Sequence, residues 1–125
     1  MATVALTQAN FEQTLKENET VIIDFWAPWC GPCQSYGPVF EKTSEQFDDV
    51  VFAKINTEDE QELAGYFQIR SIPTTVILRD GVGVFQQSGS LPEEAIVDIL
   101  GQVKALNMDD VRKEIAEQQA EQEGK

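Results

Sequence analysis

The sequence predicts an α/β fold, with a mixed central sheet of about five strands and helices on both of its faces. Two observations support this class. Short apolar runs alternate with longer segments of helical spacing, which is typical of parallel strands joined by helices. Further along, Asp80-Gly81 separates two short apolar runs and indicates a tight antiparallel hairpin.

The predicted strands, in chain order, occupy residues 4–6, 21–26, 50–55, 74–78 and 82–86. Residues 21–26 are apolar on both faces apart from Asp24, so this strand belongs in the middle of the sheet. The short run at residues 4–6 is expected at an edge.

The predicted helices occupy residues 8–18, 33–47, 59–66 and the segment that follows Pro92. In the first helix, Phe11 and Leu15 are four residues apart and share a face, and Thr7 is the expected N-cap. The second helix contains Pro38, which should kink it because proline lacks a backbone donor.

The last two of these helices should each bury one face. The inward side chains are expected to be Leu63 and Tyr66 in the third helix, and Ile96, Ile99, Leu100 and Val103 in the fourth. Ser90 and Glu93, three residues apart, predict a capping box before the fourth helix, with Pro92 in its first turn.

The composition describes an acidic chain of one domain. The 125 residues include 22 acidic and 9 basic side chains, for a net charge of −13. That charge argues against nucleic acid and against anionic membrane surfaces as partners. Residues 1–4 lack a basic stretch followed by an apolar run, so we expect no signal peptide and a reducing, cytoplasmic location.

We expect a domain at residues 1–106 and an acidic extension at residues 107–125. The extension has one short apolar stripe, made by Met108, Val111 and Ile115. Such weak amphipathicity predicts a segment that is weakly helical or frayed. A docked helix and a partner-binding arm are the alternatives.

The only two cysteines lie in the motif Trp29-Cys30-Gly31-Pro32-Cys33. Two thiols this close can exchange a disulfide for a dithiol. At the start of a helix, backbone N–H groups and the helix dipole would stabilise the thiolate of Cys30, and a thiolate attacks a foreign disulfide. The motif therefore predicts disulfide exchange, with Cys30 attacking and Cys33 resolving.

Two other interpretations of the motif are weaker. A zinc site needs three or four protein ligands, and the chain has no histidine and no third cysteine, so carboxylates would have to complete it. No metal site is expected. A purely structural disulfide across two residues would close too small a loop to stabilise the fold much through chain entropy.

With the cysteines placed at a strand-to-helix turn, residues 3–106 resemble the bacterial-type thioredoxin family. The matching segments are residues 24–33, Pro38, residues 52–56, residues 70–74, residues 80–81 and Gly89. The resemblance implies the thioredoxin fold and a general protein-disulfide reductase active in electron transport and cell redox homeostasis. It implies a monomer with no bound cofactor, recharged by thioredoxin reductase with electrons from NADPH. Implied substrates include ribonucleotide reductase, peroxiredoxins and methionine sulfoxide reductases.

Asp24 and Lys54 are further candidate catalytic residues. Strand alternation places Asp24 on one face with Ile22 and Trp26, and burial there should raise the pKa of its carboxyl. The resemblance implies that Asp24 serves as general base and acid for Cys33, and that Lys54 approaches Asp24 and tunes it. An Asp24 facing solvent and a Lys54 extending to the surface are the alternatives.

The resemblance also implies an active-site loop and substrate groove around Cys30. Its residues are Trp29, Gly31, Pro32, Ile72, Pro73 and Gly89. In the family the Ile72–Pro73 bond is cis and faces the cysteines, and the backbone of Ile72 can pair with an extended substrate segment. The Gly-Pro pair between the cysteines is the one found in reductases of this family.

Three positions depart from the family pattern. Gln34 stands where many members have lysine, Gly37 precedes Pro38, and Ser88 stands where an apolar residue is common. None of these changes removes a catalytic group, although with each of them the partners implied by the resemblance no longer follow directly.

Three alternative functions remain open from the sequence. The first is a thioredoxin-like co-chaperone, which the extension at residues 107–125 suggests although the helical repeats of such proteins are absent. A partner-binding subunit acting without redox turnover is the second alternative. An exported oxidase or isomerase is the third, and the Gly-Pro pair disfavours it.

Overall fold

The computed structural model describes residues 3–123 of the chain. The strands are β1 (Thr3–Ala5), β2 (Thr20–Trp26), β3 (Val51–Asn56), β4 (Thr74–Arg79) and β5 (Val82–Ser88). The helices are α1 (Phe11–Glu17), α2 (Gly31–Ser44), α3 (Gln61–Tyr66), α4 (Glu93–Lys104) and α5 (Met108–Glu123).

The strands form one five-stranded sheet in the order β1-β3-β2-β4-β5. The N-terminal strands β1, β3 and β2 run parallel, and β4 and β5 add antiparallel pairs. The predicted mixed sheet is therefore confirmed, with β2 at its centre and β1 at an edge. The register places Asp24 of β2 between Lys54 of β3 and Thr75 of β4.

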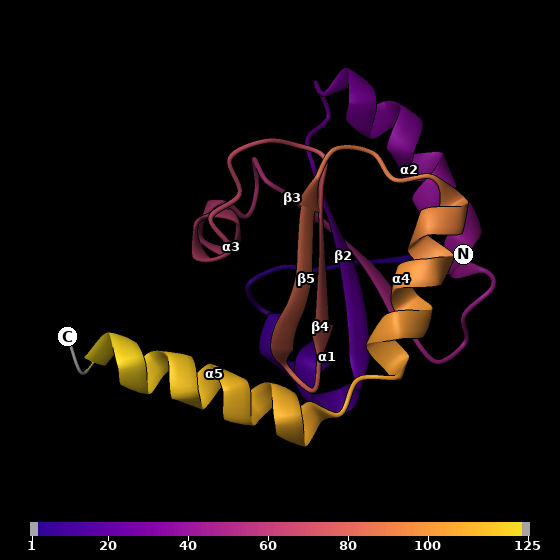
Figure 1. The fold of residues 1–125 in the computed structure, drawn as a ribbon. Coiled ribbons are helices and arrows are strands. Elements are labelled where there is room, and N and C mark those ends of the chain that lie inside the picture. The colour runs from indigo at the N-terminus through magenta and orange to yellow at the C-terminus, as the bar shows by residue number, and fades with distance from the viewer. Residues whose placement is uncertain (1–2, 124–125) are drawn as a thin grey trace.

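Two apolar layers cover the two faces of the sheet. Val21, Ile23 and Phe25 of β2 pack with residues of α1 and α3 on one face. Ile22, on the other face, packs with residues of α2 and α4. Figure 1 shows α2 and α4 together on one side of the sheet and α3 on the other. Because Asp24 is two residues from Ile22 along β2, it shares the face of Ile22 and points toward the side of α2.

The start of α1 differs from the prediction. We expected a helix from residue 8 capped by Thr7, but α1 begins at Phe11. The side chain of Asn10 accepts a hydrogen bond from the backbone N–H of Thr7 at 2.8 Å. This contact closes a turn before the helix, so Thr7 does not act as its cap.

Two expectations for the later helices are wrong. Tyr66 is 75% exposed, while the neighbouring Phe67 packs against the core, because α3 ends at Tyr66 and the chain turns there. The capping box of Ser90 and Glu93 does not form, since α4 begins at Glu93 and Pro92 is its N-cap. The inward face of α4 is confirmed for its three buried residues, Ile96, Leu100 and Val103.

The second helix is also displaced from its expected bounds. It begins at Gly31, two residues earlier than expected, and ends at Ser44. Pro38 lies inside it, as the sequence predicts. The earlier start brings the whole Gly31-Pro32-Cys33 segment into the first turn of α2.

The C-terminal extension forms the helix α5, which extends away from the sheet in Figure 1. Its beginning is anchored, because Met108 is 6% exposed and Val111 and Ile115 are half-buried. Arg112 pairs with Asp80 of the β4–β5 turn, with 3.6 Å between guanidinium and carboxylate. The described side chains beyond Ile115 are exposed, so only the first half of α5 is docked.

Candidate active site

The two cysteines lie where the chain leaves β2 and enters α2. Cys30 is the N-cap of α2, and its Sγ accepts a hydrogen bond from the backbone N–H of Cys33 at 3.2 Å. The two residues are joined by a disulfide, with 5.2 Å between their Cα atoms. Pro32, in the first turn of α2, suits the start of a helix because that position needs no backbone donor.

Burial of the whole residues does not distinguish the two cysteines, since Cys30 is 5% exposed and Cys33 is 4% exposed. Position does distinguish them. The Sγ of Cys30 lies at the N-terminal end of a helix of 14 residues, where the helix dipole and free N–H groups favour negative charge. In the reduced protein this placement favours the thiolate of Cys30 over that of Cys33.

A surface of exposed residues surrounds the cysteines. Trp29 is 68% exposed, and its indole N–H donates a hydrogen bond to the carboxylate of Glu58. Gly31 and Pro32 are also exposed. Glu58 was not among the expected site residues; its distance from Trp29 in the sequence hides the contact.

The loop before β4 brings the remaining groove residues to the disulfide. The carbonyl oxygen of Ile72 lies 3.7 Å from the Sγ of Cys30. The Ile72–Pro73 peptide bond is cis. Gly89, with φ of 97°, donates its backbone N–H to the carbonyl oxygen of Pro73 at 2.8 Å. Ile72 is half-buried and Pro73 is buried, so Ile72 is the residue of this pair that a partner can reach.

Asp24 is fully buried in the centre of the sheet. Within the described part of the chain, neither of its carboxylate oxygens has a hydrogen-bond partner. The Nζ of Lys54 lies 3.8 Å from one of them, an ion-pair distance. Burial raises the pKa of Asp24 from 3.8 to about 6, and the ammonium of Lys54 lowers it in part. This carboxyl group can therefore exchange a proton near neutral pH.

Lys54 occupies the space between three neighbours. Its Nζ lies 5.1 Å from the ring centroid of Trp26, a cation–π contact, and near the carboxylate of Asp24. The third neighbour is Gly37 of α2. The lysine side chain is 29% exposed, so it connects the buried aspartate to the surface.

Tyr36 and Thr75 are two buried polar residues near Asp24 that sequence reasoning missed. The hydroxyl of Tyr36 and the Oγ1 of Thr75 are hydrogen-bonded at 2.8 Å. Burial raises the pKa of Tyr36 to about 12, the hydrogen bond to Thr75 opposes this, and the charge of Asp24 adds to it. Tyr36 is one helical turn from Cys33, and this spacing could have predicted that the two residues share a face of α2.

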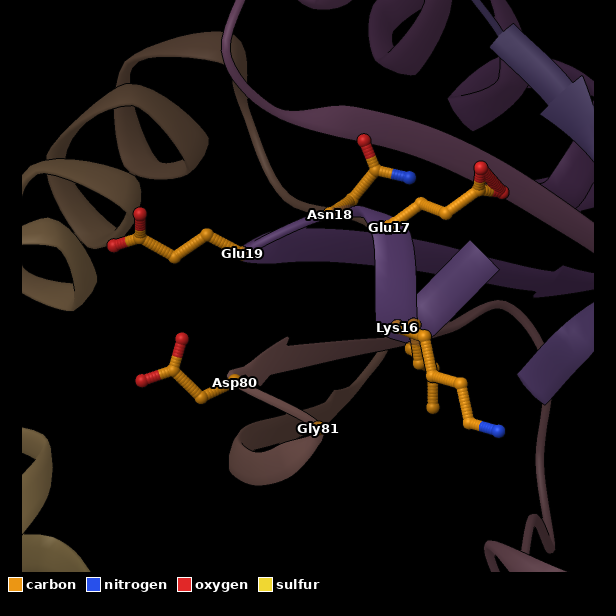
Figure 2. A pocket seen from close by; sticks show the side chains of 7 residues that line it. Lys16, Glu17, Asn18, Glu19, Asp80 and Gly81 are labelled. Carbon is orange, nitrogen blue, oxygen red and sulfur yellow. The ribbon is translucent and has the colours of Figure 1, made fainter. Parts of the chain in front are cut away.

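A separate pocket of about 460 Å³ lies at the opposite end of β2, between the end of α1 and the β4–β5 turn. Figure 2 shows the carboxylates of Glu17 and Glu19 extending in opposite directions, with Lys16 pointing away from both. None of the residues that line it carries a thiol. The carboxylates of Glu19 and Asp80 are each paired with an arginine, Arg79 and Arg112, so we assign no reactive centre to this pocket.

Residues 3–123 hold neither a cluster of metal ligands nor a membrane-spanning helix. Within this range, no three or more His, Cys, Asp or Glu side chains gather closely enough to hold a metal ion. None of the helices in the same range has the length and apolarity needed to cross a membrane.

The fold and the cysteine pair define a thiol-disulfide oxidoreductase, because a dithiol and a disulfide interconvert at the start of a helix on an α/β domain. A family model described as Thioredoxin matches residues 2–102. The chain belongs to the thioredoxin family.

The chain matches similar proteins along most of their length. A protein named "Putative thioredoxin 2" from Streptomyces coelicolor is 56% identical over 120 residues, which cover 96% of this chain and 90% of that protein. A thioredoxin from Alicyclobacillus acidocaldarius is 42% identical over 96 residues, which cover 76% of this chain and 91% of that protein. The solved structure of a mutant thioredoxin from Halobacterium salinarum has a TM-score of 0.77 and 34% identity, covering 84% of this chain and 92% of that chain.

These findings confirm the predicted activity. The chain is a protein-disulfide reductase with a redox-active cysteine pair, its substrates are proteins that contain disulfides, and its family needs no bound cofactor. The alternative of a co-chaperone or binding subunit without redox turnover is not favoured.

Proposed function

We propose that Cys30 is the attacking nucleophile and Cys33 the resolving thiol of a general protein-disulfide reductase. The single observation that supports this assignment best is the position of the Cys30 Sγ at the N-cap of α2. The N-terminal end of the helix favours its thiolate, and the thiolate is the form that attacks a disulfide.

The reaction proceeds in two exchange steps. The thiolate of Cys30 attacks one sulfur of the target disulfide, forms a mixed disulfide and expels the other target sulfur as a thiolate. The thiolate of Cys33 then attacks the Sγ of Cys30 and expels the second target sulfur. Two electrons pass to the target, and the Cys30–Cys33 disulfide is the oxidised product.

Asp24 is proposed as the proton acceptor for Cys33. The carboxylate takes the proton of the Cys33 thiol before the second step and returns it to a leaving thiolate or to solvent. A raised pKa of about 6 supports both directions of transfer. Lys54, 3.8 Å away, tunes this carboxylate by favouring its charged form.

The residues around Cys30 are proposed to bind the substrate. They are Trp29, Gly31, Pro32, Ile72 and Gly89, with the buried Pro73 supporting them by accepting the backbone N–H of Gly89. The exposed indole of Trp29 offers an apolar surface. The carbonyl of Ile72, close to the Cys30 Sγ, supports backbone pairing with an extended segment of the target.

The wider setting is also a proposal. The domain spans residues 1–106, works as a monomer in the cytoplasm, and is recharged by thioredoxin reductase with electrons from NADPH. Ribonucleotide reductase, peroxiredoxins and methionine sulfoxide reductases are the proposed substrates. The acidic net charge of −13 supports partners with neutral or basic contact faces and argues against nucleic acid and anionic membranes.

The test is the reduction potential of the Cys30–Cys33 pair, measured by equilibration with dithiothreitol or glutathione and read by the fluorescence of Trp26 and Trp29. We expect about −270 mV, the value of thioredoxin itself. A value of about −180 to −120 mV would instead indicate an isomerase or an oxidase.

A further inference from the structure

Gly37 shares a face of α2 with the resolving cysteine. The two residues are four apart, so they lie one helical turn from each other, and both are buried. Tyr36 is also buried on this side and interacts with the charge of Asp24. The face of α2 that carries Cys33 and Gly37 therefore covers the part of the sheet that holds Asp24.

The space beside Gly37 is occupied by the ammonium group of a lysine. A Cβ built on Gly37 would lie 3.2 Å from the Nζ of Lys54. This distance is shorter than an ordinary van der Waals contact between carbon and nitrogen, so the present position of Lys54 requires a residue without a side chain at this point of α2.

The same Nζ is the charge nearest to the buried carboxylate. It lies 3.8 Å from the Oδ2 of Asp24, which has no hydrogen bond within the described residues. The attraction between two charges weakens in inverse proportion to their distance, and it matters more where water is largely excluded. A displacement of the Lys54 Nζ by a few tenths of an ångström therefore changes how strongly the charged form of Asp24 is stabilised.

We propose that Gly37 is a positioning residue for the redox reaction: its missing side chain lets the Lys54 ammonium approach Asp24 and hold that carboxylate in its charged form. The consequence for proton transfer rests on the proposed role of Asp24 toward Cys33. Lys54 is the cation that acts on Asp24, while the charge of Asp24 acts on Tyr36, whose hydroxyl bonds to Thr75.

A methyl group at position 37 would displace Lys54 rather than the helix. The Nζ is the end of a flexible chain, and Lys54 together with Trp26 lines a surface pocket of about 430 Å³ into which it can withdraw. Alanine is also favoured over glycine within a helix, so the Gly37→Ala protein should fold.

The expected displacement has a measurable size. Moving the ion pair from 3.8 Å to about 4.2 Å weakens the attraction by roughly a tenth, which corresponds to a rise of about 0.3 in the pKa of Asp24. The direction is upward, because the lysine favours the ionised form and is now farther away.

The experiment is an NMR titration of the Asp24 side-chain carboxyl carbon in the Gly37→Ala protein. The oxidised protein is used, since its disulfide removes the two thiols from the titration. Gly101→Ala is the matched control, because Gly101 also lies within a helix and a Cβ there meets nothing within 4 Å. We expect the pKa of Asp24 to rise in Gly37→Ala and to stay unchanged in Gly101→Ala.

A double-mutant cycle with Lys54→Met isolates the proposed cause. Without the ammonium group, Gly37→Ala should no longer raise the pKa of Asp24. An unchanged pKa in Gly37→Ala alone, or an equal rise in the Lys54→Met background, would overturn the proposal.

The pH profile of protein-disulfide reduction separates this inference from the proposed function. If the pKa of Asp24 rises and the pH profile of reduction shifts to higher pH with it, the positioning by Gly37 and the role of Asp24 as proton acceptor both stand. If the pKa rises while the pH profile stays in place, the positioning by Gly37 stands and the role of Asp24 as proton acceptor fails.

Discussion

Asp24 and Lys54 lie opposite each other on the neighbouring parallel strands β2 and β3, and the Nζ of the lysine is 3.8 Å from the Oδ2 of the aspartate. The pair is unequal, because the aspartate side chain is fully buried while the lysine side chain is 29% exposed. The lysine therefore compensates only part of the cost of burying the carboxylate, and the pKa of Asp24 stays raised at about 6.

Asp24→Asn should stabilise the protein at pH 7. The pKa of Asp24 is higher in the folded protein than its ordinary value of 3.8, so the unfolded chain ionises first as pH rises. The contribution of Asp24 to stability is therefore greatest below about pH 4 and is lost as pH rises through about 6. The difference between the two pKa values corresponds to about 3 kcal/mol, which is the upper limit of the gain in the free energy of unfolding.

Urea unfolding at pH 4, 5, 6, 7 and 8 measures this effect. The wild-type protein should lose stability between about pH 4 and 6 relative to Asp24→Asn, and the gap should be constant above that range. An equal gap at every pH would show that the asparagine acts through packing rather than through the charge.

Cys33→Ser should trap a mixed disulfide between Cys30 and a target. The serine hydroxyl cannot displace the target sulfur from Cys30, so the reaction stops after its first step. Incubation of the reduced variant with an oxidised protein substrate, followed by non-reducing electrophoresis and mass spectrometry, measures the product. Cys30→Ser is the matched control and should form little or none; equal trapping by both variants would contradict the assigned order of attack.

The sequence predicted the order of elements well because that order depends on local patterns. Residues 21–26 are apolar on both faces apart from Asp24, and they form the central strand, as predicted. Asp80-Gly81 predicted a hairpin, which is confirmed as the β4–β5 turn. Helix starts were predicted less well. Thr7 was the predicted cap of α1, but the N-cap is Asn10, whose side chain accepts the backbone N–H of Thr7 in the folded chain.

At the site, too, features that depend on neighbouring residues were predicted, and contacts between residues far apart in the sequence were not. Strand alternation favoured a buried Asp24 with a raised pKa over an Asp24 facing solvent, and the structure confirms the burial. The contacts of Lys54 with Gly37 and of Trp29 with Glu58 join residues far apart in the sequence. No local pattern reports which side chain fills the space beside a helix, so these contacts required the structure.

Deleting residues 107–125 should lower stability while leaving the reduction potential unchanged. The deletion removes the buried side chain of Met108 and the pairing of Arg112 with Asp80. We expect a loss of about 1–3 kcal/mol in the free energy of unfolding, mainly from the methionine. Deleting only residues 119–125, whose described side chains are exposed, is the matched control and should cost little. A shift of the potential would show that α5 acts on the cysteines.

Glu58→Ala should weaken the reduction of protein substrates without changing the reduction potential. The carboxylate of Glu58 accepts the indole N–H of Trp29, and this contact holds an exposed aromatic ring beside the disulfide. Losing one exposed hydrogen bond of about 0.5–1 kcal/mol should raise KM roughly two- to fivefold, with kcat little changed. Glu58→Gln keeps an acceptor and should restore most of the loss. Steady-state kinetics with a protein disulfide measure both variants, and an unchanged KM in Glu58→Ala would mean that Trp29 is held by its packing alone.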